Sequence, residues 1–359
     1  MPTVSKDQVL EALRRVQDPE LHKDLVSLDM IKNVAVCDGR VKVHVELTTP
    51  ACPQKETIEA DVRREVGRIE GVQDVELEWS AQVRGHAQLQ TQMPGVKNII
   101  AVGAGKGGVG KSTIAVALAF GLDRMGATVG LMDADVYGPS IPKMIGMEGA
   151  RPTVRDEKIV PIESDGVRVM SMGFMVGAED AVVWRGPMLA GVIKQFLSQV
   201  HWGELDYLIV DLPPGTGDVP LTLAQSIPIT GAVVVCTPQE VALLDATKAL
   251  RMYQKLNVEI LGIVENMSFF IAPDTGKEYD LFGKGGAQKA AQQLSVPFLG
   301  SIPINIALRI SGDAGRPGDI FDKTDSATKE SLEAFFRATA GQVSTRNLRQ
   351  QPAVELTIS

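Results

Sequence analysis

The sequence predicts an α/β fold in which a mainly parallel sheet is flanked by helices and is preceded by a small α+β domain. Three short apolar runs, 98–102, 128–132 and 207–210, each lead directly into a segment rich in glycine or aspartate, which is typical of buried parallel strands. Helical spacing over 112–125 follows the first run. At 359 residues the chain is long for one compact core, so two domains are expected.

Residues 1–85 are predicted to form the small domain. Ser5 is placed to cap a helix through Arg15, and alternating apolar and polar residues near 41–47 and 72–79 predict two half-buried strands. A charged helical segment separates the strands, so we expect an antiparallel sheet covered by helices. The remaining boundaries are a linker over 86–96, the second domain over 97–341, and a polar tail over 342–359 without the apolar face of a membrane-binding helix.

The segment Thr48-Thr-Pro-Ala-Cys-Pro53 separates the first strand from the charged helix. Pro53 suits the first position of a helix, which would place Cys52 at the N-cap, where the helix dipole lowers the pKa of a thiol. Cys52 is therefore a candidate thiolate, although a small buried residue in a tight turn explains the same pattern. The other cysteines, Cys37 and Cys236, are interpreted as packing residues.

The segment 105–113 reads Gly-Lys-Gly-Gly-Val-Gly-Lys-Ser-Thr and fits the spacing G-x-x-x-x-G-K-S/T of a phosphate-binding loop. Its glycines allow backbone N–H groups to surround a β-phosphate at a helix N-terminus. Lys111 would neutralise β- and γ-phosphate charge, and the Ser112 hydroxyl would bind Mg²⁺. One lysine suffices for this cradle, so Lys106 needs another explanation. The predicted nucleotide-binding residues of the loop are Gly105, Lys106, Gly107, Gly108, Val109, Gly110, Lys111, Ser112 and Thr113.

Two acidic segments each follow a predicted strand, where ligands bind open parallel α/β sheets. One reads Asp133-Ala-Asp135-Val-Tyr-Gly-Pro-Ser, and the other reads Asp211-Leu-Pro-Pro-Gly-Thr-Gly-Asp. Asp211, Asp133 and Ser112 are the candidate Mg²⁺ residues, and Asp133 or Asp135 could orient the water that attacks the γ-phosphate. Aspartate also commonly ends strands and caps helices. Three aspartates close to the predicted phosphate site nevertheless favour a role in nucleotide binding.

These motifs, together with Thr237-Pro-Gln239, resemble the Mrp/Nbp35 family from about Val96 to about Gly341. That family comprises deviant P-loop ATPases of the same clan as the cell-division ATPase MinD, the nitrogenase iron protein and ParA, and its members bind and transfer iron–sulfur clusters while ATP controls the dimer. The resemblance implies that Lys106 reaches across a homodimer to the partner's nucleotide and that Asp135 positions the hydrolytic water. Lys106, Lys111 and Asp135 are thus the predicted catalytic residues. It also implies that Asn266 and Pro303 line the adenine pocket.

The first domain carries a second resemblance. Asp18-Pro-Glu and the segment around Cys52 are similar to the MIP18 (DUF59) family, which is linked to iron–sulfur assembly and is often fused ahead of such ATPases. This second resemblance implies that Cys52 is a candidate iron–sulfur ligand.

The sequence departs from the family pattern after Glu265-Asn-Met-Ser268. The resemblance implies a Cys-x-x-Cys pair there, with which two subunits hold a 4Fe–4S cluster. Ala272 and Thr275 stand at those positions, and neither replaces a thiolate. Cluster handling could instead use Cys52 of each subunit with Cys37, a histidine, a carboxylate or a small thiol. Alternatively, the chain is an accessory ATPase acting on partner-held clusters, or it serves a different ATP-dependent client.

Composition excludes several other classes. A net charge of −8 argues against nucleic-acid binding, and no apolar stretch approaches the roughly 18 residues of a membrane helix. Three cysteines form no disulfide framework, and the first residues lack a signal-peptide core, so a cytoplasmic location is expected. The leading hypothesis is a slow, homodimeric ATPase that carries or assembles clusters for apoproteins with scaffold proteins, and contacts neither nucleic acid nor membrane. A MinD/ParA-like positioning ATPase and a non-enzymic nucleotide-dependent scaffold are the rivals.

Overall fold

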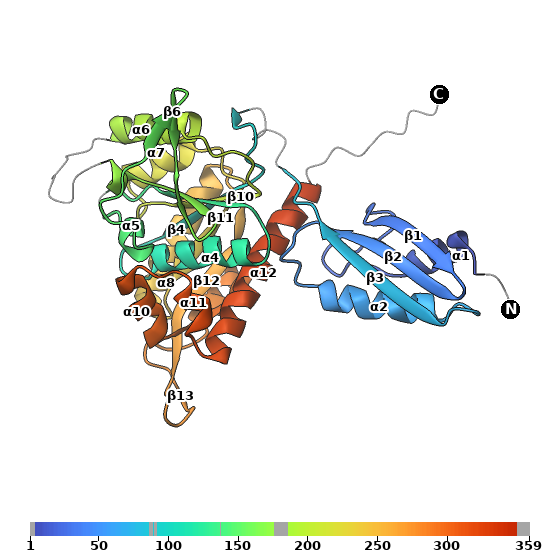
Figure 1. Ribbon diagram of the computed structural model, residues 1–359. Helices are drawn as coiled ribbons and strands as arrows, with labels where there is room; N and C mark the ends of the chain where they lie inside the picture. The colour runs from blue at the N-terminus through green and yellow to red at the C-terminus, as the bar shows by residue number, and fades with distance from the viewer. Residues whose placement is uncertain (1–3, 86–88, 90–91, 137, 176–185, 350–359) are drawn as a thin grey trace. The chain divides into compact units, whose positions relative to one another are not determined.

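The computed structural model describes residues 4–85, 89, 92–136, 138–175 and 186–349 (Figure 1). The chain divides into two compact units. The first comprises Met1–Arg84 with Ala340–Ser359, and the second comprises Gly85–Thr339.

The first unit contains a three-stranded sheet in the order β1-β2-β3. Its elements are α1 (Lys6–Leu13), β1 (Ile31–Cys37), β2 (Arg40–Leu47), α2 (Lys55–Gly67) and β3 (Asp74–Ala81). The predicted cap is present, because the Ser5 side chain accepts a hydrogen bond from the backbone N–H of Gln8 while the Gln8 side chain bonds back to Ser5. Val41, Val43 and Val45 point into the core of this unit.

The pairing of the third strand differs from the prediction. β1 and β2 form an antiparallel hairpin, but β3 runs parallel to β2. The expectation of an antiparallel sheet is therefore wrong for this pair. The physical reason is α2, which crosses over between the two strands and returns the chain in the same direction.

The end of the described chain is helical. α12 (Ser326–Arg349) continues through most of the segment predicted as a polar tail, and the side chain of Val343 is buried. Ser344 Oγ lies 2.7 Å from Thr48 Oγ1, and Asn347 Nδ2 donates to the carbonyl oxygen of Arg84 at 2.9 Å. These contacts hold 342–349 as helix, which corrects the tail prediction there; 350–359 lie outside the described residues.

The second unit is built on a nine-stranded sheet in the order β13-β12-β11-β4-β10-β5-β9-β8, with β14 beside β12. Its strands are β4 (Ile99–Ala104), β5 (Val129–Asp133), β8 (Ile162–Ser164), β9 (Val167–Ser171), β10 (Tyr207–Asp211), β11 (Gly231–Cys236), β12 (Ile260–Ile271), β13 (Glu278–Tyr279) and β14 (Phe298–Ile304). All neighbouring pairs are parallel except those made by β8 and β13. β6 (Thr153–Arg155) and β7 (Lys158–Val160) form a separate hairpin. This arrangement confirms the predicted fold class.

Helices cover both faces of this sheet (Figure 1). They are α4 (Lys111–Arg124), α5 (Ile141–Met144), α6 (Gly186–Gln199), α7 (Asp218–Ser226), α8 (Glu240–Lys255), α9 (Gly286–Leu294), α10 (Ile306–Ala314), α11 (Asp319–Asp322) and the 3₁₀ turn η1 (Met172–Phe174). Residues of α6 to α9 share one core with alternate strand residues, and α4 packs on the opposite face. No helix within the described ranges is both long and apolar enough to span a bilayer.

The segment 86–96 was expected to be a linker. Of its described residues, Leu89, Met93 and Val96 are buried in the core shared by α6 to α9. These three side chains therefore belong to the packed second unit rather than to a tether.

Candidate functional site

The phosphate-binding loop connects the carboxyl end of β4 to the first turn of α4. Gly110 is the N-cap of α4 and has a φ of +83°, and Gly108 has a φ of +81°, a left-handed conformation that favours glycine. A Cβ atom on Gly105 would lie 2.1 Å from the backbone carbonyl of Asp245, and one on Gly110 would lie 2.2 Å from Asn266 Nδ2. Close backbone approach and backbone conformation therefore both require glycine here.

Two acidic segments meet the start of α4 at this edge of the sheet. Lys111 Nζ lies 2.6 Å from Asp211 Oδ1 and 3.3 Å from Asp135 Oδ2, and Ser112 Oγ donates to Asp211 Oδ2 at 2.6 Å. The adjacent carboxyl ends of β4, β10 and β5 bring these residues together, because Asp211 lies in register with Val102 and Asp133. The structure thus brings Lys111, Ser112, Asp135 and Asp211 together, and their roles towards phosphate and Mg²⁺ stay predictions.

Lys111 is the only cation in contact with these carboxylates among the described residues, and it is 6% exposed. Burial by itself would lower the pKa of Lys111, but attraction to Asp211 and Asp135 outweighs burial and raises the pKa above the usual value for lysine. Lys111 therefore stays charged.

Asp133 is fully buried beside this ion pair. Ser171 Oγ lies 2.9 Å from Asp133 Oδ2, and the backbone N–H of Asp135 donates to Oδ1 at 3.1 Å. Burial, followed by repulsion from Asp211, raises the pKa of Asp133 to about 8. The carboxyl group is thus protonated at neutral pH in the nucleotide-free protein, and Mg²⁺ binding to it would release a proton.

The proton on Asp133 predicts a pH dependence of stability. The folded chain keeps this proton up to about pH 8, whereas the unfolded chain loses it near the ordinary aspartate pKa of 3.8. Because the folded state binds more protons between those values, the free energy of unfolding should fall as pH rises, by at most about 1.4 kcal/mol per pH unit. Asp133→Asn should remove this slope in urea unfolding series in EDTA; an equal slope in both proteins would contradict the assignment.

The structure also places the residues that the family resemblance assigned. Asn266 Nδ2 donates to the carbonyl oxygen of Val109 at 2.9 Å, so this side chain contacts the phosphate loop itself. Pro303 is buried on β14, beside β12. Lys106 is half-buried and makes no hydrogen bond or ion pair with any described residue. The adenine and dimer roles of these residues remain predictions.

Cys37, Cys52 and Cys236 lie in different segments of the fold. Cys236 is buried on β11, where burial raises the pKa of its thiol to about 12. Cys37 is exposed at the end of β1, so its interpretation as a packing residue is wrong. Cys52 is buried, but α2 begins at Lys55 with Gln54 as its N-cap, because a turn separates Pro53 from the helix. The N-cap is therefore Gln54, two residues after the predicted position at Cys52.

Ala272 and Thr275 lie in the turn between β12 and β13, in a hairpin that projects from the sheet (Figure 1). The N–H of Ala272 donates to the carbonyl oxygen of Lys277 at 3.0 Å, and that of Gly276 donates to the carbonyl oxygen of Ala272 at 2.8 Å. Thr275 is exposed. Within the described parts of the chain, no group of three or more histidine, cysteine or acidic side chains is arranged to hold a metal ion.

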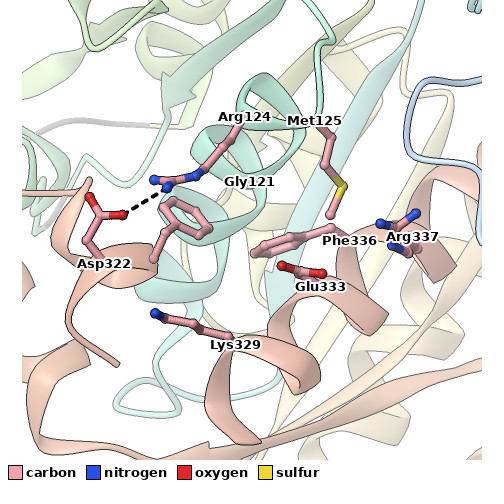
Figure 2. A pocket seen from close by; sticks show the side chains of 9 residues that line it. Gly121, Arg124, Met125, Asp322, Lys329, Glu333, Phe336 and Arg337 are labelled. Carbon is pink, nitrogen blue, oxygen red and sulfur yellow. Dashed lines mark hydrogen bonds and ion pairs between the residues drawn. The ribbon is translucent and has the colours of Figure 1, made fainter. Parts of the chain in front are cut away.

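A pocket of about 410 Å³ lies elsewhere, among α4, α11 and α12 (Figure 2). Arg124 and Asp322 form an ion pair of 2.8 Å at its rim, and Phe336 lies beside Gly121. Arg124 and Gly121 belong to the last turn of α4, roughly 15 to 20 Å along the helix from Lys111 at 1.5 Å per residue. This pocket is therefore separate from the phosphate loop.

Sequence reasoning missed two contributors to the site. Ser171, which contacts Asp133, ends β9 in register with that residue. Its only sequence signal is its position at the end of an apolar run, as for Asp133 and Asp211. The backbone of Asp245 on α8 packs against Gly105, and nothing in the local sequence indicates that contact.

Comparisons with known proteins agree with this geometry. The model of the NUBPL iron-transfer P-loop NTPase family matches residues 95–340, and that of the iron-sulfur cluster assembly protein family matches residues 6–79. An iron-sulfur cluster carrier protein of Deinococcus radiodurans is 53% identical over 347 residues, covering 96% of this chain and 98% of the relative.

Two solved structures resemble the second unit. A nucleotide-binding protein from Archaeoglobus fulgidus, in complex with ADP, has a TM-score of 0.57 and 41% identity, and the match covers 64% of this chain and 90% of that one. The cell division ATPase MinD of Pyrococcus furiosus has a TM-score of 0.51 and 23% identity, covering 67% and 97%, and indicates the fold alone.

Proposed function

Because the chain belongs to the family of NUBPL iron-transfer P-loop NTPases, we propose that it binds and hydrolyses ATP in order to carry or assemble iron–sulfur clusters for apoproteins. The cluster is cargo in this scheme. The observation that carries the nucleotide half of the proposal is the convergence of Lys111, Ser112 and Asp211 at the carboxyl edge of the sheet.

Each residue of this cluster has a role in the proposed hydrolysis. The loop N–H groups and the start of α4 bind the β-phosphate. The ammonium group of Lys111 leaves Asp211 and pairs with the β- and γ-phosphates. Ser112 and Asp211 supply the oxygen donors that Mg²⁺ prefers, Asp211 through water. Asp135 orients the attacking water towards the γ-phosphate.

The proposal includes a homodimer in which Lys106 contacts the partner's nucleotide. Lys106 is half-buried on a glycine-rich loop, and the described residues of its own chain give its ammonium group no anionic partner. A γ-phosphate presented by a second copy would supply one. Such a contact forms only in the ATP state, so hydrolysis would weaken the dimer and couple nucleotide state to cargo affinity.

The residues present do not fit the bridging cluster of the family pattern. Alanine and threonine occupy the hairpin positions 272 and 275, and Cys236 is buried within a strand. Cys52 therefore remains the candidate ligand, because it lies in the segment that matches the iron-sulfur assembly family. The alternative is an accessory ATPase that acts on clusters held by other proteins.

Anaerobic reconstitution with iron and sulfide separates these two forms of the proposal. The carrier form predicts iron that remains bound after desalting, is lost in Cys52→Ala and is retained in Cys37→Ala, with circular dichroism confirming that each variant is folded. If the intact chain retains no iron, the carrier form fails. If, in addition, ATP does not change the rate at which a loaded scaffold protein activates an apoprotein in its presence, the accessory form fails as well.

A further inference from the structure

The pocket among α4, α11 and α12 combines an apolar interior with charged side chains around it (Figure 2). All of its lining residues lie in the second unit. Its volume of about 410 Å³ falls within the roughly 300–1,000 Å³ that is usual for small-molecule sites. The pocket lies at the opposite end of α4 from Lys111, so the nucleotide proposal does not account for it.

The interior of the pocket is formed by two aromatic rings and a methionine. The rings of Phe321 and Phe336 meet edge to face with their centroids 6.1 Å apart. Gly121 allows this packing, because a Cβ atom there would lie 2.3 Å from the ring of Phe336. Phe321 and Met125 are only half-buried. An apolar ligand would cover their remaining surface, which is favourable because apolar area is removed from water.

Two of the charged side chains at the pocket are already paired with each other. Arg124 lies 2.8 Å from Asp322, and its guanidinium group also stacks over the ring of Phe321 at 5.2 Å from the centroid. Arg337, another cation of the lining, takes part in a further interaction within the chain. These contacts account for the charges of Arg124 and Asp322 without a ligand.

Lys329 on α12 differs from these residues. It is half-buried in the lining, and its ammonium group makes no hydrogen bond or ion pair with any residue that the structure describes. Partial removal of an ammonium group from water is unfavourable unless another contact replaces the water. An anionic group on a ligand would supply that contact as a charge-assisted hydrogen bond.

Glu333 limits the charge that such a ligand can carry. It lies one turn after Lys329 on the same helix and also lines the pocket, but it is exposed and therefore hydrated. A single negative charge can approach Lys329, whereas a second negative charge on the same ligand would be repelled by Glu333. The lining thus favours a monoanion over a dianion.

We propose that this pocket is a binding site for an organic monocarboxylate with a compact aromatic or branched apolar body. The carboxylate pairs with Lys329, and the apolar body packs against Phe321, Phe336 and Met125. Glu333 selects against ligands with two negative charges. The proposal does not depend on the nucleotide or cluster chemistry.

Three probes that share one ring system test the ligand class. They are 2-naphthoate, the uncharged 2-naphthamide and the dianion naphthalene-2,6-dicarboxylate, each titrated calorimetrically into the full chain at neutral pH. We expect 2-naphthoate to bind about tenfold or more tightly than either of the other two, because it alone gains the contact with Lys329 without repulsion from Glu333. No binding of 2-naphthoate, or equal binding of 2-naphthoate and 2-naphthamide, would overturn the proposal.

Two variants of the lining assign the contacts to residues. Lys329→Gln should weaken binding of 2-naphthoate by about tenfold or more and leave that of 2-naphthamide unchanged. Glu333→Gln should bring the affinity for the dicarboxylate close to that for 2-naphthoate. The matched control is Lys323→Gln, because Lys323 is exposed outside the lining and pairs with Asp319 at 2.8 Å.

Circular dichroism checks that each variant is folded. The control should bind 2-naphthoate as the unmodified chain does. If Lys329→Gln also binds 2-naphthoate with unchanged affinity, Lys329 does not hold the carboxylate and the proposal fails.

Photolabelling locates the site independently. The aromatic monocarboxylate 4-benzoylbenzoate inserts into nearby C–H bonds under near-ultraviolet light, and peptide mass spectrometry identifies the labelled residue. We expect label on Met125 or within 321–337, and we expect excess 2-naphthoate to suppress it. Label confined to other segments, or label that 2-naphthoate does not suppress, would contradict the assignment of this pocket.

Discussion

Replacing Lys111 with Met is expected to abolish ATP hydrolysis, weaken ATP binding and lower the stability of the nucleotide-free protein. The ammonium group lies 2.6 Å from Asp211 and 3.3 Å from Asp135 in a site that is almost fully buried. Removing one member of a buried ion pair typically costs about 3–5 kcal/mol, because the remaining charge is left unpaired. Lost charge-assisted bonds to phosphate, at about 1.5–3 kcal/mol, correspond to roughly 10- to 150-fold weaker binding.

A matched control is Lys248→Met. Lys248 also forms an ion pair with an aspartate, at 3.0 Å from Asp245, but its side chain is 67% exposed. Exposed pairs contribute about 0–1 kcal/mol, so this variant should unfold close to the wild-type urea midpoint and bind ATP normally. Urea unfolding and calorimetric titration with ATP measure both quantities. If the two variants behave alike, Lys111 is not the central charge of the site.

The double variant Lys111→Met with Asp211→Asn tests the ion pair and the phosphate contact of Lys111 separately. Removing the second charge of the pair should restore part of the lost stability, because no unpaired carboxylate then remains at that position. ATP binding should not recover, since the positive charge is still absent. Recovery of stability without recovery of binding therefore separates the ion pair from the phosphate contact.

The convergence of Lys111, Asp135 and Asp211 could be predicted from the sequence because each lies at or after the end of a strand. Asp211 ends β10, Asp135 follows β5 by two residues, and Lys111 follows β4 across the phosphate loop. Lys111, Asp135 and Asp211 come from three separate segments, yet the carboxyl ends of parallel strands β4, β5 and β10 meet at one edge. Local motifs at strand ends are thus sufficient to place side chains that are far apart in the chain.

Ser171 and the β3 pairing could not be predicted in the same way. The contact of Ser171 with Asp133 depends on which strands are neighbours, and a single serine carries no motif. The direction of β3 depends on the crossover through α2, whereas the alternation of its residues is the same in parallel and antiparallel sheets. Both features are set by tertiary contacts.

The first residue of α2 could not be predicted from the sequence for a different reason. Proline at the first helical position and proline in a turn just before a helix look the same in the sequence, because both favour the same φ. Pro53 occupies the second kind of position, so Cys52 lies two residues before the Gln54 N-cap. Cys52 therefore does not cap α2, and the reconstitution experiment tests its role as a ligand.

Asp135→Asn is expected to reduce ATP hydrolysis by about 100-fold or more while leaving ATP binding intact. Asp135 is 9% exposed, and its carboxylate lies 3.3 Å from Lys111, next to the expected position of the γ-phosphate. Asparagine keeps the shape of the side chain but cannot accept a proton or orient water through a charge. Because this variant would no longer convert its bound ATP to ADP, it should accumulate as a dimer in the presence of ATP. Size-exclusion chromatography with light scattering can measure this dimer.

Mixing Asp135→Asn with Lys106→Ala tests whether Lys106 acts across the dimer. If Lys106 contacts the partner's nucleotide, each protein alone is inactive, but a mixed dimer contains one site with Asp135 from one chain and Lys106 from the other. Random assortment makes half of the dimers mixed, and each has one of its two sites complete, so about a quarter of wild-type hydrolysis should return. If Lys106 acts on the nucleotide of its own chain, neither site of the mixed dimer is complete and no activity returns. The mixture therefore distinguishes the two geometries by presence or absence of hydrolysis, without requiring a structure of the dimer.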